Sequence, residues 1–135
     1  MRFLHLSDLH LGKRVCEFSM LDDQRYILEE ILSLLDTRPV DAVLLAGDLY
    51  DKPVPPAEAV RLLDWFLTEL ADRKLPVFAI SGNHDSAERV AFGAHLLAGS
   101  QVYVSPVFEG APAPIPLTDA YGPVDIYLLP FLKPA

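Results

Sequence analysis

The sequence is poor in cysteine, in basic residues and in long hydrophobic runs. Its single cysteine, Cys16, excludes an internal disulfide framework and suits a reducing compartment. Eleven lysines and arginines stand against nineteen acidic residues, giving a formal net charge of −8. This charge excludes a polybasic protein that coats DNA by neutralising many phosphates. It is compatible with a nucleic-acid enzyme whose positive charge is carried by bound metal ions.

Membrane and secretion signals are also missing. No apolar run approaches the length that crosses a bilayer, and too few residues precede the first acidic one, Asp8, for a signal-peptide core. These absences predict a soluble, cytoplasmic protein without a membrane partner. Hydrophobic residues make up 51% of the 135 residues, which predicts one globular domain with a real core.

Hydrophobic patterning predicts strands that alternate with helices. Short apolar runs indicate strands at residues 2–7, 42–46, 77–80 and 102–105. Helical spacing indicates helices at residues 22–36, from Pro55 onward, and at about 86–97. Their expected buried stripes are Ile27, Leu28, Ile31, Leu32 and Leu35 in the first helix and Val60, Leu63, Leu67 and Leu70 in the second. This order is typical of an α/β domain with a parallel sheet covered by helices.

The last third of the chain is rich in proline. Seven of the twelve prolines follow residue 105, and a further strand is expected at 124–129. Because proline cannot donate to a strand ladder, Pro112, Pro114 and Pro116 are expected in a loop or on an edge strand. The chain stops just past an apolar strand, so we expect residues 1–135 to be part of a larger domain.

Polar side chains follow each of the first three predicted strands. The clusters are Asp8-Leu-His10, Gly47-Asp48-Leu-Tyr-Asp51 and Gly82-Asn83-His84-Asp85. Because the carboxyl ends of parallel strands share one sheet edge, the three clusters are expected to converge. Asp8 and His10 are two residues apart, so in extended backbone both side chains point the same way.

The ligand types of these clusters indicate a metal site. Carboxylate, imidazole and amide oxygen together suit Mn²⁺, Fe²⁺ or Zn²⁺, and Asp48 is able to bridge two ions. Two such ions clamp the attacking and leaving oxygens of a phosphoester during hydrolysis. Asp, Asn and Gly are also ordinary turn residues, but three clusters in order at strand ends favour the metal site.

The three clusters resemble the motifs D-x-H, G-D-x-x-D and G-N-H-[DE] of the calcineurin-like metallophosphoesterases. More closely, residues 3–12, 46–51, 82–86 and 130–134 are similar to segments of the SbcD-type DNA exonucleases. This resemblance implies the N-terminal part of a four-layer α/β/β/α sandwich. It also implies metal-dependent hydrolysis of phosphodiester bonds at DNA ends and hairpins in repair and recombination. The implied partners are DNA, an SbcC-type ATPase and a second copy in a homodimer.

The resemblance implies a role for each motif residue. Two divalent ions, usually Mn²⁺ with Fe²⁺, Zn²⁺ or Mg²⁺ as alternatives, would be held by Asp8, His10, Asp48 and Asn83, with Asp48 bridging. His84 would lie over the scissile phosphate and stabilise the transition state or protonate the leaving oxygen. Asp85 would orient His84, and Asp51 would support its loop.

The sequence departs from the family pattern after the third motif. An isolated histidine and a G-H-x-H segment, which should supply further ligands, are absent, and His95 falls in a helical stretch as a structural residue. We therefore expect residues 1–135 to form a partial nuclease domain whose metal site is incomplete and weakly active.

Three basic residues are candidate DNA contacts: Lys13, Arg14 and Arg89. Solvated surface charge explains each of them equally well. Two other functions stay open: a related phosphoesterase that acts on a small phosphoester or a phosphoprotein, and a non-catalytic module that holds a partner.

Overall fold

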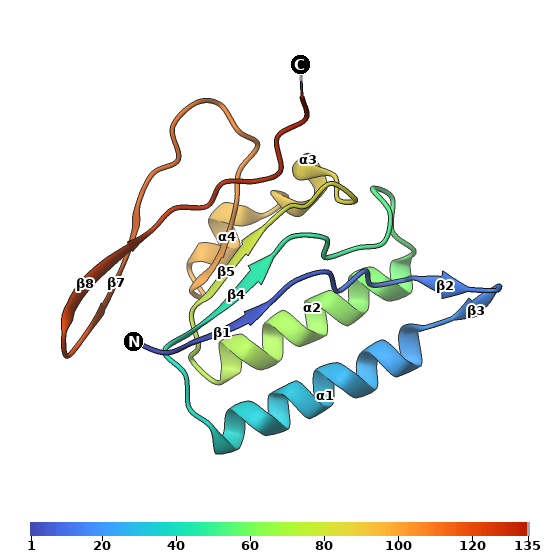
Figure 1. Ribbon diagram of the computed structural model, residues 1–135, viewed down its shortest axis with the longest axis horizontal. Helices are drawn as coiled ribbons and strands as arrows, with labels where there is room; N and C mark the ends of the chain where they lie inside the picture. The colour runs from blue at the N-terminus through green and yellow to red at the C-terminus, as the bar shows by residue number, and fades with distance from the viewer. Residues whose placement is uncertain (135) are drawn as a thin grey trace.

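The structure is a computed structural model that describes residues 1–134 (Figure 1). Its centre is a parallel sheet with the order β1-β4-β5-β6. The strands are β1 (Phe3–Leu6), β4 (Ala42–Ala46), β5 (Val77–Ile80) and β6 (Val102–Val104). The predicted α/β class and parallel sheet are confirmed, and β4 and β5 begin and end at the predicted residues.

The helices cover one face of this sheet. They are α1 (Leu21–Thr37), α2 (Ala57–Asp72), α3 (Ala87–Val90) and α4 (Ala94–Ala98), and Figure 1 shows α1 and α2 side by side. Alternate strand residues such as Val43, Leu45, Val77 and Ala79 point to this face and form the main core with the helices. Because these strands are parallel neighbours, the loops that follow β1, β4 and β5 all lie at the same end of the sheet.

The buried stripes of α1 and α2 differ from the expected ones. Ile27 and Val60 were expected in the core but are 53% and 44% exposed, respectively. The core instead receives Leu28, Leu32 and Leu35 from α1 and Ala59, Leu62, Leu63, Phe66 and Leu70 from α2. Each successive helical residue turns by about 100°, so a neighbour of a core residue readily faces solvent.

The single helix expected at 86–97 is wrong. Gly93 has a left-handed φ of 74°, and this conformation separates α3 from α4. Ser86 caps α3 by accepting a hydrogen bond from the Arg89 backbone N–H. A short hairpin of β2 (Arg14–Val15) and β3 (Phe18–Ser19) was not anticipated.

The second face of the sheet carries a smaller cluster. An antiparallel pair of β7 (Ile115–Asp119) and β8 (Gly122–Ile126) packs there, and Leu128 is buried beside Phe78. β7 was not expected as a strand, and the strand expected at 124–129 begins and ends earlier. Pro116 lies in this two-stranded sheet, where each strand is an edge, as its chemistry requires. No helix within residues 1–134 is long and apolar enough to cross a membrane.

Candidate metal centre at the strand ends

The loops that follow β1 and β4 run side by side at the carboxyl edge of the sheet. The Asp8 backbone N–H donates to the Gly47 carbonyl at 3.1 Å, and the His10 N–H donates to the Asp48 carbonyl at 2.9 Å. A parallel bridge between Leu11 and Tyr50 continues this pairing. The first two motifs are therefore fixed to one another by backbone hydrogen bonds.

The backbone in these loops is strained. Asp8, His10 and Asp48 have φ values of 57°, 44° and 50°, in the left-handed region that residues with a Cβ seldom adopt. The extended backbone expected between Asp8 and His10 is therefore wrong. Each such residue costs about 1–3 kcal/mol, and strain of this kind gathers at functional sites, where surrounding contacts hold it.

Two glycines allow the loops after β4 and β5 to touch. A Cβ added to Gly82 would lie 2.1 Å from Asp48 Oδ1 and 2.3 Å from the Asp48 backbone nitrogen. A Cβ on Gly47, whose φ is 92°, would lie 3.0 Å from the Gly82 Cα. The two glycines thus let the third motif approach the Asp48 carboxylate directly.

A first group of metal-binding side chains consists of Asp8, His10 and Asp48. His10 Nε2 lies 3.7 Å from Asp8 Oδ1 and 3.7 Å from Asp48 Oδ2. These separations are too long for hydrogen bonds and leave three electron-rich atoms facing a common point. Asp8 and Asp48 also line a cleft of about 300 Å³ together with Asn83, and His10 is not among the residues that line it. Asp8 and Asp48 are thus shared between the cleft and the group that contains His10.

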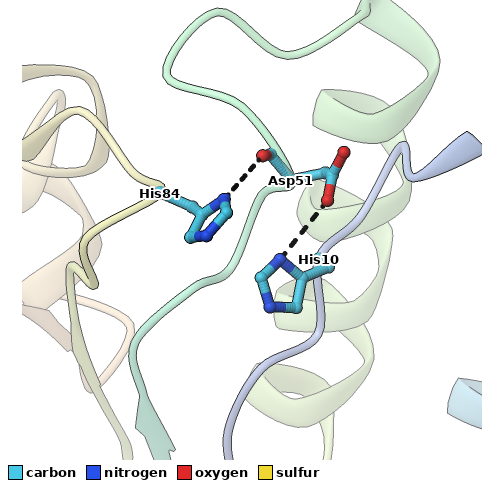
Figure 2. Close-up of side chains that lie close together, drawn as sticks. All are labelled: His10, Asp51 and His84. Atoms are coloured by element: carbon cyan, nitrogen blue, oxygen red, sulfur yellow. Dashed lines mark hydrogen bonds and ion pairs between the residues drawn. The ribbon is translucent and has the colours of Figure 1, made fainter.

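A second group consists of His10, Asp51 and His84 (Figure 2). His10 Nδ1 lies 3.4 Å from Asp51 Oδ1, and His84 Nδ1 lies 3.1 Å from the Asp51 backbone carbonyl oxygen. The two imidazole rings meet edge to face with centroids 4.9 Å apart. Asp51, which the sequence assigned only to loop support, therefore contacts both histidines. The G-D-x-x-D spacing was the signal for it.

The donor set fits a divalent cation. His10 Nδ1 is buried and, among residues 1–134, has no partner with hydrogen-bond geometry, although it lies at ion-pair distance from Asp51. A neutral ring that carries its proton on Nδ1, toward Asp51, leaves Nε2 free to bind metal. Carboxylate oxygens and an imidazole nitrogen suit Mn²⁺, Fe²⁺ or Zn²⁺.

Asp85 holds the backbone of the site. Its buried carboxylate accepts hydrogen bonds from the N–H groups of Leu49 at 3.0 Å, Tyr50 at 2.9 Å and Gly82 at 2.8 Å. The expected orientation of the His84 ring by Asp85 has no counterpart in these contacts. The His84 backbone N–H donates to Asp48 Oδ1 at 2.9 Å, and its ring faces the Asp51 carbonyl.

The three candidate DNA contacts lie in different places. Lys13 Nζ is 3.8 Å from Asp51 Oδ1, at the rim of the metal centre, and Arg14 is exposed on β2. Arg89 instead lines a groove with Tyr50 and Phe92.

Burial raises the pKa of Tyr50 to about 12, so its phenol stays protonated near neutral pH.

His95 lies apart from the metal centre. It is exposed on α4 and belongs to neither metal-binding group among the described residues. The exposed position of His95 gives no support to the structural role expected for it from the sequence.

Two comparisons with known proteins identify the family of the chain. Residues 1–129 match the family described as "Calcineurin-like phosphoesterase". The chain is 36% identical over 132 residues to the SbcD component of the nuclease SbcCD from Staphylococcus epidermidis, and 33% identical to the same component from Staphylococcus saprophyticus. Each match covers 97% of this chain and 34% of the relative, so the chain spans about a third of those proteins. With the family match covering nearly every residue, the chain belongs to the calcineurin-like phosphoesterases.

Proposed function

We propose that this chain is part of a metal-dependent nuclease that hydrolyses phosphodiester bonds at DNA ends and hairpins during repair and recombination. The observation that carries the proposal is the convergence of Asp8, His10 and Asp48 at the ends of neighbouring parallel strands. The name shared by the two staphylococcal relatives, a subunit of a nuclease, supports a nucleic acid as the substrate.

Four side chains are the metal ligands in this proposal. Asp8 and His10 would hold one ion, Asn83 would hold a second, and Asp48 would contribute to holding both. When bound, Mn²⁺ ions supply Lewis-acid polarisation of the phosphoryl oxygens and an activated water nucleophile. The carboxylates of Asp8 and Asp48 in the cleft would offset the repulsion between the two positive ions.

His84 is the proposed acid–base residue. Its ring is exposed beside the cleft, so it is accessible to a bound phosphodiester. With Nδ1 facing the Asp51 carbonyl oxygen, a proton on Nδ1 is held and Nε2 is directed away from Asp51. A protonated ring donates to the leaving oxygen, or stabilises the charge that develops on the phosphate.

The hairpin of β2 and β3 is the proposed duplex contact. Lys13 provides a positive charge at the rim of the acidic centre, Arg14 provides another on β2, and Phe18 is 76% exposed on β3. Basic groups attract the phosphate backbone irrespective of its sequence. Arg89 is a separate candidate contact from the groove beside α3.

We further propose that residues 1–135 are a partial nuclease domain. The family resemblance implies three more histidine ligands. After His84 the sequence contains only one histidine, His95, which belongs to neither metal-binding group among the described residues. The remaining ligands would come from further sequence of the natural chain. An SbcC-type ATPase and a second copy of this chain are the proposed partners.

Cleavage of end-labelled duplex and hairpin DNA tests the nuclease proposal. The natural full-length chain and residues 1–135 are assayed with Mn²⁺, beside Asp48→Asn and the matched control Asp125→Asn, whose side chain is exposed on β8. We expect cleavage by the full-length chain and by its Asp125→Asn variant, little cleavage by residues 1–135, and none by Asp48→Asn. Absence of DNA cleavage by the full-length chain would contradict the proposal.

The alternative substrate is a small phosphoester or a phosphoprotein. The three motifs are shared across the calcineurin-like family, so the geometry of the metal centre is equally suited to either substrate. A generic phosphodiester and a phosphopeptide assayed in parallel separate the two functions. Turnover of these compounds without cleavage of DNA would favour the alternative.

A further inference from the structure

We propose that Gln24 is a positioning residue of the metal centre, which holds the loop carrying His10 in its metal-binding conformation. This inference rests on the proposed metal site but not on the identity of the substrate. It concerns the first turn of α1, a segment that none of the three motifs includes.

The loop from Asp8 to Gly12 needs external support because its backbone is unusual. Asp8, His10 and Gly12 have φ values of 57°, 44° and 88°, so every second residue is left-handed. A residue with a Cβ persists in this region only when neighbouring groups fix it. The β4 loop fixes one side of the segment by accepting the N–H groups of Asp8, His10 and Leu11.

Gln24 fixes the other side of the segment. Its Nε2 donates to the carbonyl oxygens of Leu9 at 3.2 Å and His10 at 2.8 Å, while its Oε1 accepts from the Gly12 N–H at 3.1 Å. One amide thus joins three backbone groups of the loop. Among residues 1–134, no other side chain makes a hydrogen bond to the backbone of residues 9–12.

The support is rigid because Gln24 belongs to a helix that is anchored in the core. Its backbone N–H donates to the Met20 carbonyl at 2.8 Å in the first turn of α1. One turn further on, Leu28 is only 1% exposed and fixes α1 against the sheet. The buried Leu28 therefore keeps α1 in place, and α1 holds the half-buried amide of Gln24 against the backbone of His10.

Removing this amide releases one side of the loop while leaving every metal ligand in the chain. His10 Nε2 would then no longer be held opposite the carboxylates of Asp8 and Asp48, and metal affinity would fall. Loss of a residue that orients a ligand typically costs about ten- to a hundredfold in metal affinity.

Gln24→Met, which keeps the length and volume of the side chain, tests this role in the natural full-length chain. Mn²⁺ alone is the probe, and free Mn²⁺ is measured by electron paramagnetic resonance during a titration. The matched control is Gln101→Met, because Gln101 is exposed and its described hydrogen bonds involve only its backbone. A third variant, Gln24→Asn, keeps an amide that is one methylene too short to reach the loop.

We expect Gln24→Met to weaken Mn²⁺ binding by roughly tenfold or more, Gln24→Asn to weaken it as well, and Gln101→Met to leave it unchanged. Thermal unfolding without metal separates this effect from loss of the fold, and Gln24→Asn serves if Gln24→Met does not fold. Wild-type affinity in a folded Gln24 variant would overturn the proposal, as would a wild-type chain that binds no Mn²⁺. A chain that binds Mn²⁺ but does not cleave DNA would contradict only the nuclease function.

Discussion

At the scale of single residues, the side chains that hold the backbone are as important as the proposed metal ligands. Asp85 accepts hydrogen bonds from three backbone N–H groups that belong to two different motifs. A side chain at the position of Gly82 would overlap Asp48, so only glycine fits there. These two residues determine how closely the second and third motifs approach.

Replacement of Asp85 by alanine is expected to be strongly destabilising. The change leaves the N–H groups of Leu49, Tyr50 and Gly82 without their acceptor in a largely buried place. Unsatisfied buried donors cost about 1–3 kcal/mol each, so we expect a loss of roughly 3 kcal/mol in the free energy of unfolding. Urea denaturation measures it, with Asp125→Ala as the control. A loss below about 1 kcal/mol would contradict this role.

The convergence of the candidate site residues could be predicted from the sequence, but their local geometry could not. Residues Asp8, His10, Asp48 and Asn83 follow strands that hydrophobic runs identify, so their convergence follows from parallel-sheet topology. The left-handed backbone of Asp8 and His10 depends on contacts with the β4 loop, which are remote in sequence. The contacts of Asp51 with both histidines arise from the same tertiary packing.

At the scale of elements, the departures from expectation lie where local signals were weak. The turn of the β2–β3 hairpin is formed by Cys16 and Glu17 with positive φ values of 48° and 67°, without the glycine or asparagine that usually marks such a turn. Gly93 ends a helical pattern that otherwise continues. Val60 is hydrophobic enough for a core position, but its place on α2 leaves the side chain 44% exposed.

The hairpin is expected to control the salt dependence of DNA binding. Reversing the charges of Lys13 and Arg14 to glutamate should weaken binding of duplex DNA and reduce the slope of affinity against salt by about two. The matched control reverses Arg38 and Lys74, which are exposed after the carboxyl ends of α1 and α2. Fluorescence anisotropy at several salt concentrations measures the slope. Equal slopes for both double variants would contradict a specific role of the hairpin.

A salt bridge links α1 to the end of α2 and gives a pH-dependent contribution to stability. Arg73 donates to both carboxylate oxygens of Asp36, at 2.9 and 3.2 Å, and this hydrogen bonding lowers the pKa of Asp36 from its ordinary 3.8. Because the pKa is lower in the folded state, the stabilisation is present above pH 3.8 and is lost as pH falls through the lowered pKa.

The variant Asp36→Asn is therefore expected to unfold at a slightly lower temperature than wild type near neutral pH. The difference should shrink as the pH is lowered to about 3, and also in about 1 M salt, because Asp36 is exposed and its charge is screened. Differential scanning calorimetry measures the midpoints, with Asp72→Asn as the control, because Asp72 is an exposed aspartate at the carboxyl end of the other helix, α2. A difference that grows on acidification would contradict the assignment.

At the scale of the whole molecule, charge and apolar surface are distributed unevenly. The net charge of −8 includes the carboxylates of the metal centre, which repel a phosphate backbone unless cations are bound. Beside α2 and α4, a groove of about 470 Å³ carries the exposed apolar residues Val60, Phe92 and Leu96. Because these apolar side chains are exposed, the groove is a testable contact surface for the proposed homodimer, as an alternative to the DNA contact proposed for Arg89 in the same groove.

Polar substitution in the groove is expected to separate the proposed dimer. Phe92 and Leu96 are each 84% exposed, so replacing both by glutamate should leave the fold intact while placing like charges in the interface. The matched control is Tyr121→Glu, at a residue that is 95% exposed on the β7–β8 turn. Analytical ultracentrifugation of the natural full-length chain should show a dimer for wild type and the control but a monomer for the double variant. A dimer in all three samples would contradict this assignment.

Anomalous diffraction from crystals of the natural full-length chain grown with Mn²⁺ locates bound manganese directly. We expect manganese density between His10 Nε2 and the carboxylates of Asp8 and Asp48, with Asn83 beside a second ion, and loss of this density in Asp48→Asn. Ordered protein with no manganese at these residues, or manganese bound only elsewhere, would contradict the claim that the strand-end cluster is a metal centre.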